Sequence, residues 1–313
     1  MTHKEPLVSV VVRSMDRESL SEALDSISAQ TWPFIEILVV NAKGAHRDLP
    51  SIWGPHPLKV LSKGHPLPRS EAANLGLKAA QGTYASFLDD DDLLFEDHLG
   101  SLISKLEETP HVRAIYSGIR VEVYEKDSKS PIRSFDFNAP FNLQRLRGRN
   151  YIPINAMLFE RSLITQDRCC FDETLDLFED WDFWLQLSQH TPFLHQDKIT
   201  ALYRNQGGSG LGEENLEARN ARILEATAKV LAKWVPTWTP KDWAALLLER
   251  DALTERIVQH DQERILQLER DLASLRIDLQ HQKDTVAEVL SSSSWKITQP
   301  LRVLTRHLKS TAK

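Results

Sequence analysis

The sequence is poor in cysteine, and its two cysteines, Cys169 and Cys170, are adjacent. This arrangement excludes a disulfide framework and a Cys-x-x-Cys metal site, and it fits a reducing compartment. The chain also lacks any run approaching about 18 apolar residues, so it offers no candidate membrane-spanning helix. Its first residues, MTHKEPLVSV, show no basic stretch followed by a long apolar one, which argues against a signal peptide.

An excess of positive charge is missing as well. The formal net charge is -6, which argues against a nucleic-acid-binding protein. Together these absences predict a cytoplasmic protein. Any contact with a membrane would be peripheral, on the inner face of the cell membrane.

Strand and helix patterns alternate in the first third of the 313 residues. Leu7–Val12, Glu36–Val40 and Thr83–Leu88 are short and mostly apolar, as in strands that are buried on both faces. Between them, Leu20–Gln30 and Ser70–Ala80 have helical patterns. The alternation predicts an α/β domain with a largely parallel sheet, whose ligands bind beyond the carboxyl ends of the strands.

The middle of the chain is less regular. Strands are expected at Ala114–Tyr116, Ile119–Tyr124 and Ile199–Tyr203, and a helix at Phe178–Ser188. The expected organisation is a globular domain at 1–235, a helical segment at 236–290 and a basic tail at 291–313.

The helical segment has a heptad repeat. Eight of ten a and d positions over 32 residues are apolar, which predicts a coiled coil roughly 48 Å long that joins copies of the chain. A long helix folded back on the globular domain is the alternative. The a and d positions are Val258, Asp261, Ile265, Leu268, Leu272, Leu275, Leu279, Gln282, Val286 and Val289.

No acidic residue follows Glu288, and the tail contains Trp295 and several basic and apolar side chains. A basic amphipathic segment suits an anionic membrane surface. Packing on a protein partner, or a frayed end, would also be compatible with this composition.

Four consecutive aspartates, Asp89 to Asp92, end one of the expected strands. Carboxylates in this position suit Mg²⁺ or Mn²⁺ bound together with phosphate oxygens. Asp89 and Asp91 would point to the same side of a strand, and Asp92 could cap a helix starting near Leu93. An exposed acidic turn is the alternative.

Two further acids, Glu179 and Asp180, open the helix expected near residue 178. An ionised carboxylate beside an acceptor hydroxyl can act as a general base. The alternative is an acidic first turn that only favours the helix dipole. Trp181 and Trp184 in the same helix could stack on a sugar, or could belong to the core.

These segments, from about Leu7 to Tyr203, resemble family 2 glycosyltransferases in order and spacing. LVSVVVRSMDR is similar to the opening strand of that family, LSEALDSISAQTW to the next helix, and EILVVNAKG to the second strand. EAANLGLKAAQGTYASFLDDDD and FEDWDFWLQL resemble its two acidic blocks. The resemblance implies a GT-A fold, with a Rossmann-like nucleotide-binding half and a mixed sheet. The coiled coil and SWKITQPLR resemble C-terminal segments of bacterial enzymes that assemble surface polysaccharides.

The resemblance also implies roles for individual residues. Asp180 would be the catalytic base, with Glu179 beside it, and Asp91 with Asp89 would hold Mn²⁺ or Mg²⁺. Trp181 and Trp184 would contact the acceptor. The residues implied in binding the nucleotide sugar are Arg13, Asp16, Asn41, Arg69, Asp89 and Asp90.

The chain departs from the family at several of these positions. Arg13 to Asp16 replaces the usual Pro-Thr-Tyr-Asn, and Asn41-Ala42 replaces an Asp pair that commonly reads uracil. Gln206 stands where relatives often carry histidine, while Arg204 could contact phosphate. The base of the nucleotide therefore stays open.

The function implied is inverting, metal-dependent sugar transfer from a nucleoside-diphosphate sugar to a glycan or lipid-linked acceptor in surface polysaccharide synthesis. A GT-A-like scaffold subunit without catalytic activity is the alternative. A Ca²⁺-binding structural protein would explain the aspartates but not Asp180.

Overall fold

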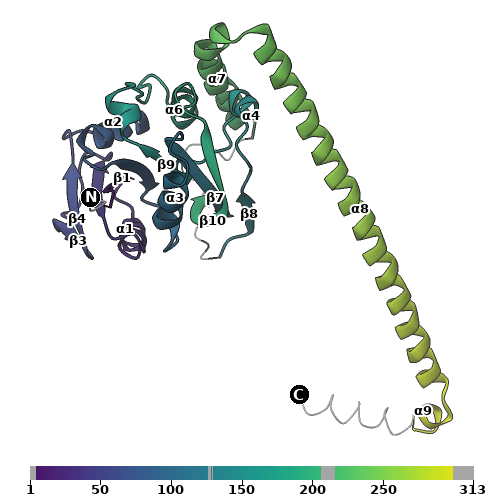
Figure 1. Ribbon diagram of the computed structural model, residues 1–313. Helices are drawn as coiled ribbons and strands as arrows, with labels where there is room; N and C mark the ends of the chain where they lie inside the picture. The colour runs from purple at the N-terminus through teal and green to yellow at the C-terminus, as the bar shows by residue number, and fades with distance from the viewer. Residues whose placement is uncertain (1–4, 126–127, 129, 206–215, 299–313) are drawn as a thin grey trace. The chain divides into compact units, whose positions relative to one another are not determined.

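The computed structural model describes residues 5–125, 128, 130–205 and 216–298 (Figure 1). By its internal contacts the chain forms two units, Met1–Glu249 and Arg250–Lys313. The first unit thus extends beyond the boundary at residue 235 that the sequence predicts. Gln206 and the tail beyond residue 298 lie outside the described residues.

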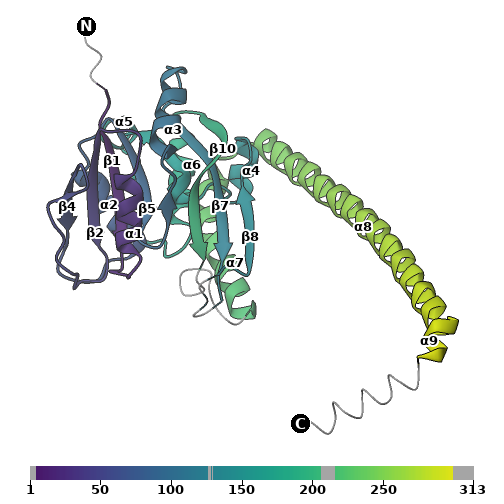
Figure 2. The same cartoon turned by 90° about the horizontal axis from the view of Figure 1, so that it is seen from below.

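The first unit is built on a ten-stranded mixed sheet. Its first part is parallel: β1 pairs with β2 and β5, and β2 pairs with β4 (Figure 2). In sheet order the strands are β3 (Ile52–Trp53), β4 (His56–Leu61), β2 (Ile35–Asn41), β1 (Val8–Ser14), β5 (Tyr84–Asp89), β9 (Met157–Glu160), β7 (Ala114–Val123), β10 (Phe193–Asn205) and β6 (Leu93–Leu94), with β8 (Arg133–Phe137) beside β7.

The helices surround this sheet. The chain steps from β1 to β2 in one direction and from β4 to β5 in the other, so right-handed crossovers put α1 and α2 on opposite faces (Figure 1). The helices of the first unit are α1 (Leu20–Ser28), α2 (Arg69–Ala79), α3 (His98–Glu107), α4 (Leu143–Gly148), α5 (Ser162–Thr165), α6 (Glu179–Leu187) and α7 (Leu216–Trp234), with 3₁₀ turns η1 (Ile154–Ala156) and η2 (Val235–Thr237).

Helices on both faces explain why the central strands are mostly apolar and almost entirely buried. All seven residues of β1 are buried. On one face α2 approaches closely because it has glycine at position 76, where a Cβ would lie 2.2 Å from Val11 Cγ1. The α/β fold with a mixed sheet is therefore confirmed.

Two local expectations need correction. Ala114–Tyr116 and Ile119–Tyr124 form one strand, β7, because the backbone pairing with β10 continues through Ser117 and Gly118. Asp92 does not cap a helix, since the residues after it form the short strand β6. The next helix, α3, begins at His98.

The second helical region consists of α8 (Pro240–Ser291) and α9 (Ser293–Ile297). α8 is one uninterrupted helix of 52 residues with none of them buried. Leu272, Leu275 and Leu279 of its heptad seam are 49%, 65% and 51% exposed. In the ranges that the structure describes, no helix is both long enough and apolar enough to pass through a bilayer.

Candidate active site

A cavity of about 450 Å³ opens where the carboxyl ends of β1, β2 and β5 meet. The start of α2 and the start of α6 complete it, together with the segment before β9. This is the edge at which parallel α/β sheets bind ligands. Among the lining residues are Arg13, Met15, Arg17, Ala42, Arg69, Asp89, Asp91, Asp92, Phe137, Asn150, Asn155, Phe178, Glu179, Asp180 and Tyr203.

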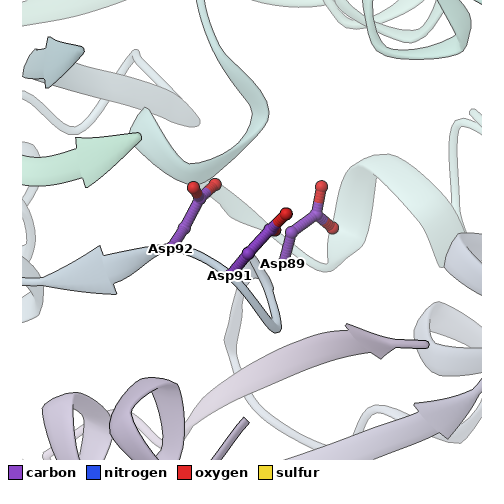
Figure 3. Close-up of side chains that lie close together, drawn as sticks. All are labelled: Asp89, Asp91 and Asp92. Atoms are coloured by element: carbon purple, nitrogen blue, oxygen red, sulfur yellow. The ribbon is translucent and has the colours of Figure 1, made fainter. Parts of the chain in front are cut away.

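Three carboxylates gather at one side of this cavity. Asp89, Asp91 and Asp92 each offer an oxygen within 4.8 Å of the others, and Figure 3 shows the three side chains pointing to the same side. Asp92 is held in place by two donors, the backbone N–H of Arg204 at 2.9 Å and Nδ2 of Asn155 at 3.2 Å. Asp89 ends β5, and Asp91 and Asp92 lie in the turn between β5 and β6, so three hard oxygen donors are grouped at this strand end.

The acidic cluster resists full ionisation. Burial, and then the charge of Asp89, raise the pKa of Asp91 to about 6. Burial and the charge of Asp91 raise the pKa of Asp92 well above its ordinary value. Five carboxyl groups and three guanidinium groups line the cavity, so acidic groups outnumber basic groups by two. A divalent cation would balance that excess, so the residues present fit such an ion.

Arg13 joins the two acidic regions of the cavity. Its Nε and one Nη donate to the two oxygens of Asp89 at 2.7 and 2.8 Å, and the other Nη donates to Glu179 Oε1 at 2.8 Å. The guanidinium is almost fully buried. Burial alone would raise the pKa of Asp89, but the charge and hydrogen bonds of Arg13, together with the charges of Arg69 and Arg17, outweigh burial and lower that pKa. Arg13, expected on the nucleotide, thus forms a buried ion triad.

Asp180 faces the same cavity from the first turn of α6. It accepts a hydrogen bond from the Trp181 backbone N–H at 2.8 Å and another from the Asn150 side chain. Burial, and then the charge of Glu179, raise the pKa of Asp180 to about 7. A carboxyl group with this pKa can accept a proton near neutral pH.

The backbone conformation at Phe178 positions Glu179 and Asp180 at the cavity wall. Phe178, just before α6, has φ +63°, a left-handed conformation that is rare for a bulky residue. This turn starts the helix abruptly at the cavity wall. Both acids then lie at the positive end of the helix dipole, which favours their ionised forms.

Four other residues are predicted from the sequence to bind the nucleotide sugar, and most of them hold loops instead of lining the cavity. They are Asp16, Asn41, Arg69 and Asp90. Asp90 is fully buried and accepts hydrogen bonds from Ser14, Met15 and Arg17, so it holds the loop after β1. Asp16 pairs with Arg47.

Asn41 accepts from the backbone N–H groups of Lys43 and Gly44 and fixes the loop after β2. Of these four residues, Arg69 lines the cavity, while Asp16, Asn41 and Asp90 are not among its lining residues. Their contacts shape the loops around the cavity.

The acceptor prediction for Trp181 and Trp184 needs correction. Both rings are in the core, with exposed fractions of 1% and 0%. Trp181 Nε1 donates to the Leu146 carbonyl and Trp184 Nε1 to the Ile152 carbonyl. Neither ring offers a free face on which a sugar could stack. The exposed aromatic ring on the cavity wall is that of Phe137.

Sequence reasoning missed Asn150, Asn155 and Tyr203, which all line the cavity. Asn150 and Asn155 flank the apolar stretch YIPI, and neither belongs to an acidic or glycine-rich pattern. β9 runs antiparallel to β5, so η1 in front of β9 lies beside the strand end that carries the aspartates. That pairing helps bring Asn155 to Asp92, 63 positions away in the sequence.

Residues 9–165, about half of the 313, match the profile of Glycosyl transferase family 2. The chain belongs to this family. It is 24% identical over 220 residues to an uncharacterised glycosyltransferase of Haemophilus influenzae, a match that covers 64% of this chain and 66% of that protein. With the glycosyltransferase YwdF of Bacillus subtilis it is 26% identical over 188 residues, covering 58% of this chain and 68% of YwdF.

A solved structure has a similar fold. A crystal structure of Staphylococcus aureus TarS, residues 1–349, in complex with UDP-GlcNAc, superposes with a TM-score of 0.53 at 17% sequence identity. The similarity covers 73% of this chain and 71% of that one. The chain spans about two thirds of the length of the curated relatives named above. The glycosyltransferase domain is thus established, and its substrates are a matter of proposal.

Proposed function

We propose that the protein is an inverting, metal-dependent glycosyltransferase that uses a nucleoside-diphosphate sugar. The observation that carries the proposal is that an acidic cluster and a carboxyl group with a pKa near 7 line the same cavity. The first suits a cation and a diphosphate, and the second suits proton removal from an acceptor. A nucleotide sugar bound between the acidic cluster and Asp180 would have a cation for its leaving diphosphate and a base for the acceptor hydroxyl.

The cation would be held by Asp91 and Asp89, with Asp92 within reach. When bound, Mn²⁺ or Mg²⁺ would offset the negative charge of the diphosphate leaving group. Arg69 and Arg17, which line the cavity, add positive charge for the phosphates. Because Arg13 already engages both oxygens of Asp89, we place Asp91 first among the ligands.

The chemical step would be a single displacement. Asp180 accepts the proton of the acceptor hydroxyl as its oxygen bonds to the anomeric carbon and the bond from that carbon to the diphosphate breaks. The configuration at the anomeric carbon inverts. Holding both substrates in one cavity supplies a large part of the remaining rate enhancement.

The substrates are proposed by class. TarS binds UDP-GlcNAc, which favours a nucleoside-diphosphate sugar as donor here. A glycan or lipid-linked acceptor in surface polysaccharide synthesis is our proposal for the other substrate. Asp90, Asp16 and Asn41 would act indirectly, by holding the loops that contact the donor.

A scaffold subunit without activity is the second candidate. The pairing of Arg13 with both oxygens of Asp89 favours it, because this carboxylate is then less available to a ribose or a cation. Hydrolysis or transfer of a nucleotide sugar by the purified protein separates the two candidates.

Loss of the cation ligand is expected to abolish metal dependence. Asp91→Asn removes a charged oxygen from the cluster, so Mn²⁺ should no longer stimulate turnover, and activity should fall by roughly 10²-fold or more. The measurement is nucleoside-diphosphate release with a panel of nucleotide sugars, with and without Mn²⁺. Asp97→Asn is the control, because Asp97 pairs with Lys198 and does not line the cavity. An Asp91→Asn enzyme that Mn²⁺ still stimulates would exclude this ligand assignment.

We also propose that α8 joins copies of the chain through its heptad seam. A row of exposed leucines at a and d positions suits a second identical helix. Leu272→Asp combined with Leu279→Asp should convert the oligomer to a monomer in sedimentation velocity at micromolar concentration. Ser274→Asp, at a c position of the same heptad, should leave the oligomer intact. A wild-type protein that sediments as a monomer would contradict the proposal.

For the basic tail after residue 290 we propose contact with an anionic membrane surface, which would keep a cytoplasmic enzyme near a lipid-linked acceptor. The composition of the tail supports this, with Trp295 and Lys296 at its start. Flotation with anionic liposomes should recover the full chain but not a chain that ends at Leu290. Equal recovery of both would contradict the proposal.

A further inference from the structure

Asn155 has a buried oxygen that nothing satisfies. The side chain is fully buried, and its Oδ1 has no hydrogen-bond partner within the described part of the chain. The same residue lines the cavity that holds the acidic cluster. A buried carbonyl oxygen without a donor is costly and calls for an explanation.

The orientation of this amide is fixed by its other atom. Nδ2 donates to Asp92 Oδ2 at 3.2 Å and to the Leu202 carbonyl at 3.4 Å. Turning the amide over would place its oxygen against these two acceptors. Oδ1 and Nδ2 are attached to the same carbon atom. Oδ1 therefore lies next to the nitrogen that contacts Asp92, a member of the acidic cluster.

The backbone gives Asn155 little freedom to move. It lies in η1, directly before β9, and β9 is paired on both sides, with β5 and with β7. The hydrogen bond to Leu202 ties it to β10 as well. These contacts hold the Asn155 side chain in position before any ion binds, and metal sites need ligands that are held in this way.

The chemistry around Oδ1 favours a cation over a sugar hydroxyl. Mg²⁺ lies about 2.1 Å from its ligand oxygens, closer than the roughly 2.7 Å of a hydroxyl hydrogen bond, so a cation needs less room beside this buried oxygen than a hydroxyl does. A neutral oxygen also adds no charge to a cavity in which acidic groups already outnumber basic groups by two.

We propose that Asn155 Oδ1 is a neutral ligand of the divalent cation, beside the carboxylates of the acidic cluster. The inference rests on the proposed function, since it presumes that the cluster binds a metal. It assigns a residue from a different part of the chain to the site. The oxygen left without a partner would be the one that completes the set of ligands.

The test replaces this oxygen by a sulfur ligand. Thiolates prefer softer ions, so Asn155→Cys should shift the metal preference from Mn²⁺ towards Cd²⁺. Binding to the full chain without nucleotide is measured from the electron paramagnetic resonance signal of free Mn²⁺, with Cd²⁺ as competitor. We expect Mn²⁺ affinity to fall roughly tenfold or more in Asn155→Cys and Asn155→Ala. Only the cysteine variant should gain in relative affinity for Cd²⁺.

Asn74→Cys is the matched control. Asn74 bonds to the backbone of Phe171 through both ends of its amide and does not line the cavity, so this variant should keep the wild-type preference. If the cysteine variant does not fold, as judged by circular dichroism, Asn155→Ser with the same Mn²⁺ titration replaces it. There too affinity should fall, and an unchanged affinity would overturn the proposal.

The outcomes distinguish the proposed metal site from the proposed role of Asn155 in it. A wild-type protein that binds no Mn²⁺ would overturn the metal site itself. Normal Mn²⁺ binding by Asn155→Ala would overturn the role of Asn155 alone. A parallel loss of Mn²⁺ and Cd²⁺ in Asn155→Cys would show that Asn155 only positions Asp92 through Nδ2.

Discussion

Asp180→Asn is expected to lower kcat by about 10²- to 10⁴-fold, the usual contribution of a general base. The substitution keeps the shape of the side chain and removes its ability to take a proton. The measurement is steady-state sugar transfer or donor hydrolysis at pH 8, where most of the wild-type Asp180 is ionised. Asp176→Asn is the control, since Asp176 is exposed in the same segment and should change nothing.

The pH dependence follows from the same group. Because the pKa of Asp180 is about 7, kcat/KM of the wild type should rise between pH 5 and pH 8. The free energy of unfolding should change in the opposite direction. The folded-state pKa of about 7 lies above the ordinary value of 3.8, so ionisation of Asp180 destabilises the fold as the pH rises from 3.8 through about 7. At pH 8 the Asn variant should be at least as stable as the wild type. Near-normal transfer by this variant would remove Asp180 from the mechanism.

Arg13→Met should have the largest effect on stability. It would leave the carboxylates of Asp89 and Glu179 without the guanidinium that all three hydrogen bonds of the triad share. Breaking a buried ion pair by removing one partner costs about 3–5 kcal/mol. The measurement is the free energy of unfolding in urea at pH 7.

Two controls define this prediction. Arg120→Met breaks an exposed pair with Asp136 and should cost less than about 1 kcal/mol. Adding Glu179→Gln to Arg13→Met removes one of the two unpaired charges and should restore part of the loss. The pKa of Asp89 is lowered in the wild type, so its contribution is present above pH 3.8 and is lost in acid. The penalty of Arg13→Met should therefore shrink as the pH falls, and a loss below about 1 kcal/mol at pH 7 would contradict the triad.

The fold could be predicted from the sequence because its signals are local. The buried face of α1, with Leu20, Ala23, Leu24 and Ile27, repeats at helical spacing and is buried as expected. The aspartates follow an apolar strand directly, so their place at the carboxyl edge needed no knowledge of distant residues. Glu179-Asp180 at the start of α6 is local in the same sense.

The remaining parts of the site depend on contacts between distant residues. The pairing of Arg13 with Glu179 spans 166 positions and the bond from Asn155 to Asp92 spans 63, and no periodic pattern reports such contacts. The acceptor prediction for the two tryptophans is wrong for a different reason. α6 is buried on most sides, so helical spacing could not tell a core face from a cavity face at Trp181 and Trp184.

The Arg13 triad has a consequence for redesign of this enzyme. One guanidinium connects the strand end that would hold the donor to the helix that would present the base, so replacing either half by itself would break the triad. A chimaera that imports the opening strand of a relative with proline at position 13 would leave Glu179 buried without its counter-ion. An exchange of segments between family members that alters the acceptor would therefore have to include both position 13 and position 179.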